Sequence, residues 1–125
     1  MKKIFVTIIT FLLTHLGFSQ ASGTYKTTLD SVSAVVIHYL QARQADSIYA
    51  LAGERFKSQL SAENFKSIAE TQLFPLNDFQ NVTYVGSINS LNKYKVAGTP
   101  VLQLLVSLDK EDKLETFLVQ PFSGN

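Results

Sequence analysis

Apolar residues recur at three- and four-residue steps through the first half of the chain, beginning near residue 28. This period predicts a helix over about 28–44, with Asp30 in its first turn, where the helix dipole favours a negative charge. Two shorter stretches of the same kind predict helical turns over 47–52 and 55–60. The apolar face of the first helix comprises Leu29, Val32, Val36, Tyr39 and Leu40.

Glycine, serine and proline mark the expected ends of these helices. Gly53 follows the second helix at the position where a left-handed residue costs least. Ser61 can accept a hydrogen bond from the amide of Asn64 and so begin a helix over 61–73. Pro75 ends that helix, because proline excludes helical geometry from the residue before it. The first half of the chain is therefore predicted to be helical.

After residue 78 the apolar positions alternate with a period of two, which predicts strands. Four strands are expected, over 79–88, 92–97, 101–108 and 113–122. Strands separated by such short connections form an antiparallel meander. Helices followed by a run of strands indicate the α+β class, with N-terminal helices packed on a curved antiparallel sheet of about four strands.

The alternation also predicts the face of the sheet on which each strand residue lies. Tyr94 is expected on the core side, opposite Lys93 and Lys95. Glu115 alternates in phase with Phe117, so we expect the two side chains to share a face. The polar face of the third strand is interrupted by Val101 and Leu105, which indicates that the chain terminus or a second copy in a dimer covers it.

The first nineteen residues have the pattern of a secretory signal peptide. Lys2 and Lys3 precede an apolar run of about a dozen residues, and Gly17 and Ser19 supply the small residues before a cleavage site. A membrane-spanning helix would need roughly 20 apolar residues, so no membrane anchor is expected. We interpret 1–19 as a signal peptide, 20–27 as a flexible arm and 28–125 as one α+β domain, exported to the periplasm or secreted after cleavage near Ser19 and Gln20.

Charge and cysteine content narrow the classes of function. Without Lys2 and Lys3, nine basic residues face ten acidic ones, so the mature chain carries a net charge near −1. Such a balance lacks the basic surface that nucleic acids or anionic membranes require, and we expect no nucleic-acid partner. The chain has no cysteine, which excludes disulfides, thiolate nucleophiles and cysteine-ligated zinc. We expect no cofactor and no metal.

Three segments resemble one domain family. They are the helical stretch DSIYALAGERFKSQLSAENFKSI, the Tyr94-Lys95 strand and the closing hairpin LLVSLDKEDKLETFLVQP. Together they resemble a small domain of exported bacterial proteins, within the nuclear-transport-factor-like, cystatin-like α+β superfamily. That domain often precedes a serine hydrolase or α/β-hydrolase domain and supplies no catalytic residues to carry over. The resemblance implies a cone-shaped fold with a mouth between the helices and the sheet.

Four residues are the candidates for lining such a pocket: Tyr94, Glu115, Phe117 and His38. The carboxylate of Glu115 would lie at the pocket rim if its face is concave, although an exposed strand end beside Lys113 is the simpler interpretation. His38 lies at the boundary of the first helix's apolar face with no partner in sequence. We assign no catalytic residue. The two S-x-x-K matches, at Ser90 and Ser107, lack the accompanying motifs of penicillin-recognising enzymes.

Three hypotheses of function remain. The leading one is an exported, non-enzymatic domain that binds an unknown small molecule or protein partner, with a homodimer through the sheet as one arrangement. The second is a small pocket enzyme of the isomerase or dehydratase type, using a carboxylate such as Glu115 with a tyrosine donor. The third, which the resemblance implies, is an accessory domain to a serine hydrolase or α/β-hydrolase that is absent or encoded separately.

Overall fold

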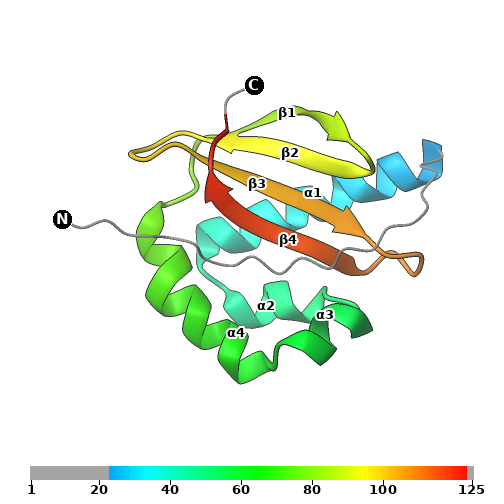
Figure 1. Cartoon of the computed structure of the whole chain (residues 1–125), viewed down its shortest axis with the longest axis horizontal. Coiled ribbons are helices and arrows are strands. Elements are labelled where there is room, and N and C mark those ends of the chain that lie inside the picture. The colour runs from blue at the N-terminus through cyan, green and yellow to red at the C-terminus, as the bar shows by residue number, and fades with distance from the viewer. Residues whose placement is uncertain (1–22, 124–125) are drawn as a thin grey trace.

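The computed structural model describes residues 23–123, and the predicted signal peptide lies outside them. Helices come first and a four-stranded antiparallel sheet follows, which confirms the α+β class (Figure 1). The helices are α1 (Gly23–Ala42), α2 (Ala45–Ala50), α3 (Glu54–Gln59) and α4 (Ala62–Ile68), the last continuing into a π-helical turn, Ala69–Leu73, and a 3-10 turn, Phe74–Leu76. The strands are β1 (Val82–Ile88), β2 (Leu91–Val96), β3 (Leu102–Leu108) and β4 (Leu114–Pro121).

The first helix begins at Gly23, five residues before the predicted start, so most of the expected flexible arm is helical. Two interactions account for the extra turn. The Tyr25 hydroxyl donates to the Ser90 carbonyl at 2.8 Å and accepts from the Leu108 amide at 3.1 Å, which fixes it to two sheet turns. Lys26 and Asp30 form an ion pair of 2.7 Å one turn apart. A pattern of apolar positions carries no sign of either interaction.

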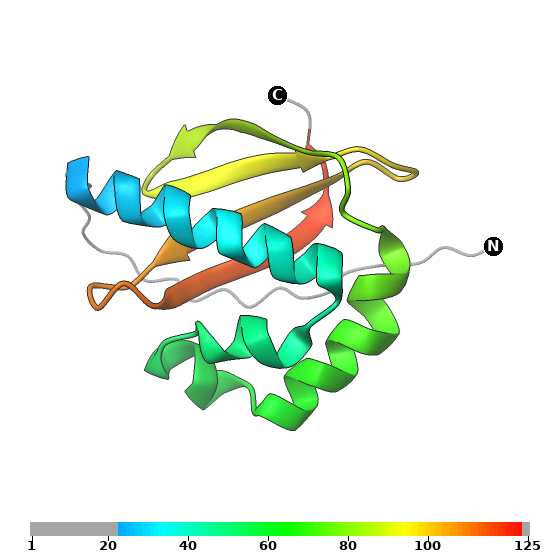
Figure 2. The ribbon, with the colours of Figure 1, turned by 180° about the vertical axis from the view of Figure 1, so that it is seen from behind.

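The sheet runs in the order β1-β2-β3-β4, and each strand pairs antiparallel with the next. Figure 2 shows α1 crossing one face of this sheet, while α2, α3 and α4 lie beside its β4 edge. The opposite face of the sheet, turned toward the viewer in Figure 1, is called the outer face below. Within residues 23–123, no helix is both long enough and apolar enough to span a membrane.

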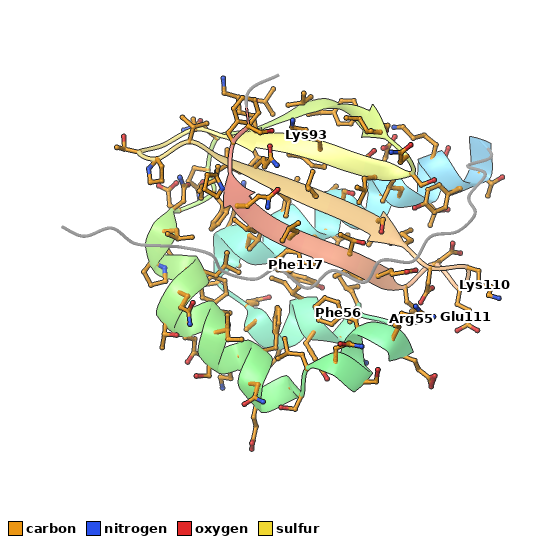
Figure 3. All side chains as sticks on the ribbon, viewed as in Figure 1. Arg55, Phe56, Lys93, Lys110, Glu111 and Phe117 are labelled. Atoms are coloured by element: carbon orange, nitrogen blue, oxygen red, sulfur yellow. The ribbon has the colours of Figure 1, made fainter. Side chains whose placement is uncertain are left out.

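An aromatic cluster joins the helices to β4 (Figure 3). The ring of Phe65 on α4 lies 5.9 Å from Phe56, 6.1 Å from Phe117 and 5.7 Å from Tyr49, measured between ring centres. Phe56, Phe65 and Phe117 are almost completely buried. The contacts of Phe65 with Phe56 and Phe117 are edge-to-face, and such contacts add to the gain from burying the rings. The position of the short helices therefore depends on the last strand.

A bulge at the start of β4 changes the predicted alternation. Leu108 pairs with Leu114 while Ser107 pairs with Thr116, so Glu115 has no opposite residue. The extra residue lets both Leu114 and Phe117 be fully buried, although they are an odd number of positions apart. Strict alternation would place Leu114 on the face opposite Phe117.

The segment between α2 and α3 approaches β4 closely. The Gly53 amide donates to the Leu114 carbonyl at 3.0 Å, and the Leu114 amide donates to the Leu51 carbonyl at 2.8 Å. Gly53 has a φ of −88°, so the predicted left-handed conformation is wrong. Glycine suits this close approach because a Cβ atom would meet the Asp109 carboxylate, which would have to shift.

Candidate functional site

The structure separates the four predicted pocket residues. His38 is exposed on α1, with its ring centre 5.8 Å from that of Tyr39. Glu115 is half-buried in the β4 bulge, and Phe117 belongs to the aromatic core. Tyr94 is buried on the α1 side of β2. Among the described residues, no hydrogen bond or ring contact joins any two of these four, and their role in a pocket stays a prediction.

Tyr94 instead belongs to a polar cluster between the first half of α1 and the β1–β2 hairpin. Asn92, which is completely buried, lies at its centre. We call this group the Asn92 cluster; it comprises Lys26, Asp30, Tyr84, Ser87, Asn92 and Tyr94.

Both the nitrogen and the oxygen of the Asn92 side-chain amide form hydrogen bonds. Its Nδ2 donates to Asp30 Oδ1 at 2.9 Å and to the Tyr94 hydroxyl at 3.1 Å. Its Oδ1 accepts from Ser87 Oγ at 2.8 Å, and Ser87 Oγ is 3.0 Å from the Tyr84 hydroxyl. The side chain of Asn92 thus connects helix α1 to two strands through a single buried amide.

Charge in this cluster is concentrated in one ion pair. The hydrogen bond from Lys26, followed by that from Asn92, lowers the pKa of the Asp30 carboxyl group below its usual value. The Asp30 carboxylate in turn raises the pKa of Lys26. Lys26 Nζ also lies 5.0 Å from the centre of the Tyr84 ring, at cation–π distance. Asp30 therefore stays ionised to a lower pH, and Lys26 to a higher pH, than either would in the unfolded chain.

These pKa directions bear on the chemistry that the cluster can perform. A general base or acid works best when its pKa lies near the working pH. The pKa shifts of Asp30 and Lys26 run the opposite way, further from neutrality. The cluster is thus suited to holding α1 against the β1–β2 hairpin rather than to moving a proton.

Sequence patterns show only part of this cluster. The spacing of Lys26 and Asp30 matches a helical ion pair, whereas the first-turn position of Asp30 predicts only an interaction with the helix dipole. Asn92 donates to Asp30 across 62 positions of sequence, and no local pattern reports such a contact. One turn beyond Asp30, Ser33 is fully buried, and its Oγ is the one buried polar side-chain atom of the described residues with no hydrogen-bond partner.

A surface depression of about 320 Å³ lies at the junction of α1, α2 and α4. Charged groups of both signs line it, and none of the four predicted pocket residues contributes. Arg43, at its rim, donates to the Phe74 carbonyl at 2.7 Å and so secures the end of α1 to the turn before the sheet. The depression is lined by Arg43, Gln44, Ala45, Asp46, Ser47, Lys66 and Glu70.

The outer edge of β1 is the most exposed part of the sheet. Among residues 23–123, no strand pairs with that edge. The exposed fractions are 47% for Tyr84, 45% for Val85 and 56% for Ile88. A register shift between Tyr84 and Gly86 leaves Val85 as a bulge residue. The strand contains no charged residue, so its free edge is uncharged, with Thr83 and Ser87 as its exposed polar residues.

Comparison of the chain with protein-family models, with curated proteins and with solved structures finds no match. The resemblance to a cystatin-like domain family of exported proteins therefore stays a prediction. Among the described residues, no group of three or more histidine, aspartate or glutamate side chains could hold a metal ion.

Proposed function

We propose that this chain is an exported, non-enzymatic partner-binding domain, and that its partner is a second copy joined through the free edge of β1. The observation that carries the proposal is that edge, which is unpaired among the described residues and exposes Tyr84, Val85 and Ile88. The unpaired N–H and C=O groups of an edge strand are a template for another strand. Natural domains usually protect such edges with charges, and β1 has none.

Self-pairing of β1 satisfies the symmetry of a two-fold dimer. An antiparallel strand paired with its own copy forms an isologous contact, in which each patch meets itself. Because β1 has no charged residue, such a pair sets no like charges opposite one another. The bulge at Val85 interrupts the ladder and restricts pairing to the short segments on either side of it.

The other edge of the sheet explains why assembly stops at two copies. At the start of β4, the Leu51–Gly53 segment occupies the outer edge through hydrogen bonds to both the amide and the carbonyl of Leu114. A parallel bridge between Ala52 and Leu114 accompanies them. Pairing at β1 leaves this partly covered edge at both ends of the combined sheet, so the assembly closes rather than extending.

The dimer is tested by sedimentation velocity over a range of concentrations. The purified chain should sediment as a dimer, and Val85→Lys should convert it to a monomer because a charge then lies on the pairing edge. Val35→Lys is the matched control, since Val35 is 38% exposed but lies on α1. A chain that is monomeric throughout, or the same behaviour of both variants, would contradict the pairing.

Export is tested separately by expressing the whole chain and determining the N-terminus of the product by mass spectrometry. We expect cleavage before Gln20 and recovery of the product outside the cytoplasm. Replacing Lys2 and Lys3 by glutamate should retain the uncleaved chain in the cytoplasm. Uncleaved wild-type chain in the cytoplasm would refute the export part of the proposal and leave the dimer untouched.

A further inference from the structure

The outer face of the sheet carries two lysines side by side with the residues that follow β4. Lys93 pairs with Leu105 and Lys95 with Gln103. Both lysines alternate along β2 with Asn92, whose side chain bonds to α1, so all four residues lie on the opposite side of the sheet. Figure 3 shows Lys93 on the sheet, away from the β3–β4 turn. Between the two lysines lies Phe122, just beyond the last strand.

The ring of Phe122 is shared by both ammonium groups. Lys93 Nζ lies 5.1 Å and Lys95 Nζ 5.2 Å from its centre, so both are at cation–π distance. Because each nitrogen is about 5 Å from the same point, the two are at most about 10 Å apart. The ring and the two ammonium groups form one unit, which we call the lysine pair.

Hydrogen bonds hold Phe122 and its neighbours in place. The Phe122 amide donates to the Val101 carbonyl at 2.9 Å, and the Ser123 amide donates to Gln103 Oε1 at 3.1 Å. Gln103 Nε2 donates in turn to Gln120 Oε1 at 2.7 Å. Phe122 and Ser123 therefore lie on the outer face, although Val101 itself remains 36% exposed, and the coverage expected there stays a prediction. These hydrogen bonds also mean that the lysine pair is organised before any partner arrives.

The charge of the lysine pair is not neutralised within the described residues. Lys26 and Asp30 form the ion pair recorded among residues 23–123, and no carboxylate of those residues lies within ion-pair distance of Lys93 or Lys95. Lys93 is only 8% exposed. The burial belongs to its aliphatic stem, while the ammonium group still reaches solvent beside Phe122, since Lys93 Nζ is not among the buried unpartnered atoms. The two ammonium groups are thus accessible to an anion supplied from outside.

We propose that the lysine pair is a docking site for an extended, acidic segment of another protein, with carboxylates at alternate positions. Lys93 and Lys95 are two residues apart on one strand, so their Cα atoms are separated by roughly 6.5 Å, the repeat of side chains on one face of an extended peptide. The half-buried side chains of Leu105 and Leu118 adjoin the pair on the outer face and suit an apolar residue of the same segment.

The acidic β3–β4 turn argues against a long polyanion as the partner. At that turn, at one end of the same sheet, Asp109, Glu111 and Asp112 outnumber Lys110 and Lys113, and Figure 3 shows Glu111 and Lys110 projecting from it. A nucleic acid or an anionic membrane that covered the sheet would meet this negative charge, whereas a segment with two or three carboxylates would not. The site is separate from the β1 edge and does not depend on the proposed dimer.

The probe is a fluorescein-labelled peptide containing Glu-Val-Glu, and its binding is followed by fluorescence anisotropy. We expect saturable binding that weakens with added salt. Lys95→Met should weaken binding about two- to fivefold, the loss expected for one exposed ion pair. Lys93→Met should do the same or more. Lys110→Met removes an equal charge from the β3–β4 turn and should leave affinity unchanged.

Three comparisons make the result decisive. A Gln-Val-Gln peptide should not bind, and a peptide with adjacent glutamates should bind more weakly than Glu-Val-Glu. Equal binding of the Gln-Val-Gln peptide, equal loss in Lys110→Met, or full competition by millimolar inorganic phosphate would each overturn the proposal. Because Lys95 is exposed, its variant should fold even if Lys93→Met does not. Retained binding by Val85→Lys would separate this site from the β1 edge.

Discussion

Replacing Asn92 by alanine tests whether the Asn92 cluster is a major source of stability. Asn92 is completely buried, and its amide makes three side-chain hydrogen bonds, to Asp30, Ser87 and Tyr94. Replacement by alanine removes all three of these hydrogen bonds at once. The loss differs among the partners, because Tyr94 is buried whereas water can replace the amide at the two exposed ones.

The magnitude follows from that difference. Stranding the buried Tyr94 hydroxyl costs about 1–3 kcal/mol, while each of the two exposed partners loses only about 0.5 kcal/mol, so the free energy of unfolding should fall by roughly 2–4 kcal/mol. For a domain of about 100 residues this corresponds to a melting temperature roughly 10–25 °C lower. The matched control is Asn64→Ala, an exposed asparagine on α4, whose effect should be within about 0.5 kcal/mol of zero.

The loss of stability in Asn92→Ala should also depend on pH. Asp30 has a pKa below its usual value, so its interactions stabilise the fold above the pKa of the unfolded chain, about 3.9. That contribution is lost as the pH falls through the lower folded pKa. In Asn92→Ala one of the two causes of the lowered pKa is gone. The difference in stability between wild type and variant should therefore narrow below about pH 4.

Urea denaturation followed by circular dichroism, repeated between pH 3 and pH 7, measures both effects. The reasoning fails if Asn92→Ala loses less than about 1 kcal/mol, the net value of a single ordinary hydrogen bond. It also fails if Asn64→Ala is equally destabilised, because burial would then not be the cause.

Three further predictions concern stability. Gly53→Ala should lower the free energy of unfolding, measured by urea denaturation, by about 1–3 kcal/mol because its Cβ overpacks against Asp109. Asp109→Ala should relieve part of that loss in the double variant, whereas strictly additive losses would contradict the contact. Tyr25→Phe should speed hydrogen exchange in the first turns of α1, since the bond from the Leu108 amide is lost, and unchanged exchange would refute that anchor. Ser33→Ala should raise the melting temperature by a few degrees, because an unpartnered buried hydroxyl is removed; a lower melting temperature would show that the hydroxyl has a partner.

Much of the fold could be predicted because it follows from patterns among residues that are close in sequence. The order of helices and strands, the serine cap at Ser61 and the opposite faces of Tyr94 and Lys93 all follow from residues a few positions apart. The bulge at Glu115 could not be predicted, since it reflects packing of Leu114 against helices that precede it by some sixty residues.

The candidate sites depended still more on distant contacts. The Asn92 cluster joins residues from α1 and two strands, and the lysine pair needs Phe122 to fold back over β2. The alternation did place Lys93 and Lys95 together on one face. What it could not show was that the two share an aromatic ring and lack a carboxylate, because those facts belong to the assembled sheet.

The dependence of the helices on β4 has a consequence for the timing of folding. Phe65 meets Phe117, and the α2–α3 segment bonds to Leu114, so neither arrangement can form until β4 has been synthesised. Contacts of such wide sequence separation delay folding. During synthesis the helices are therefore made well before the strand that completes their core. If the chain is exported unfolded, this order keeps the helical half without its core, and so unfolded, until β4 follows.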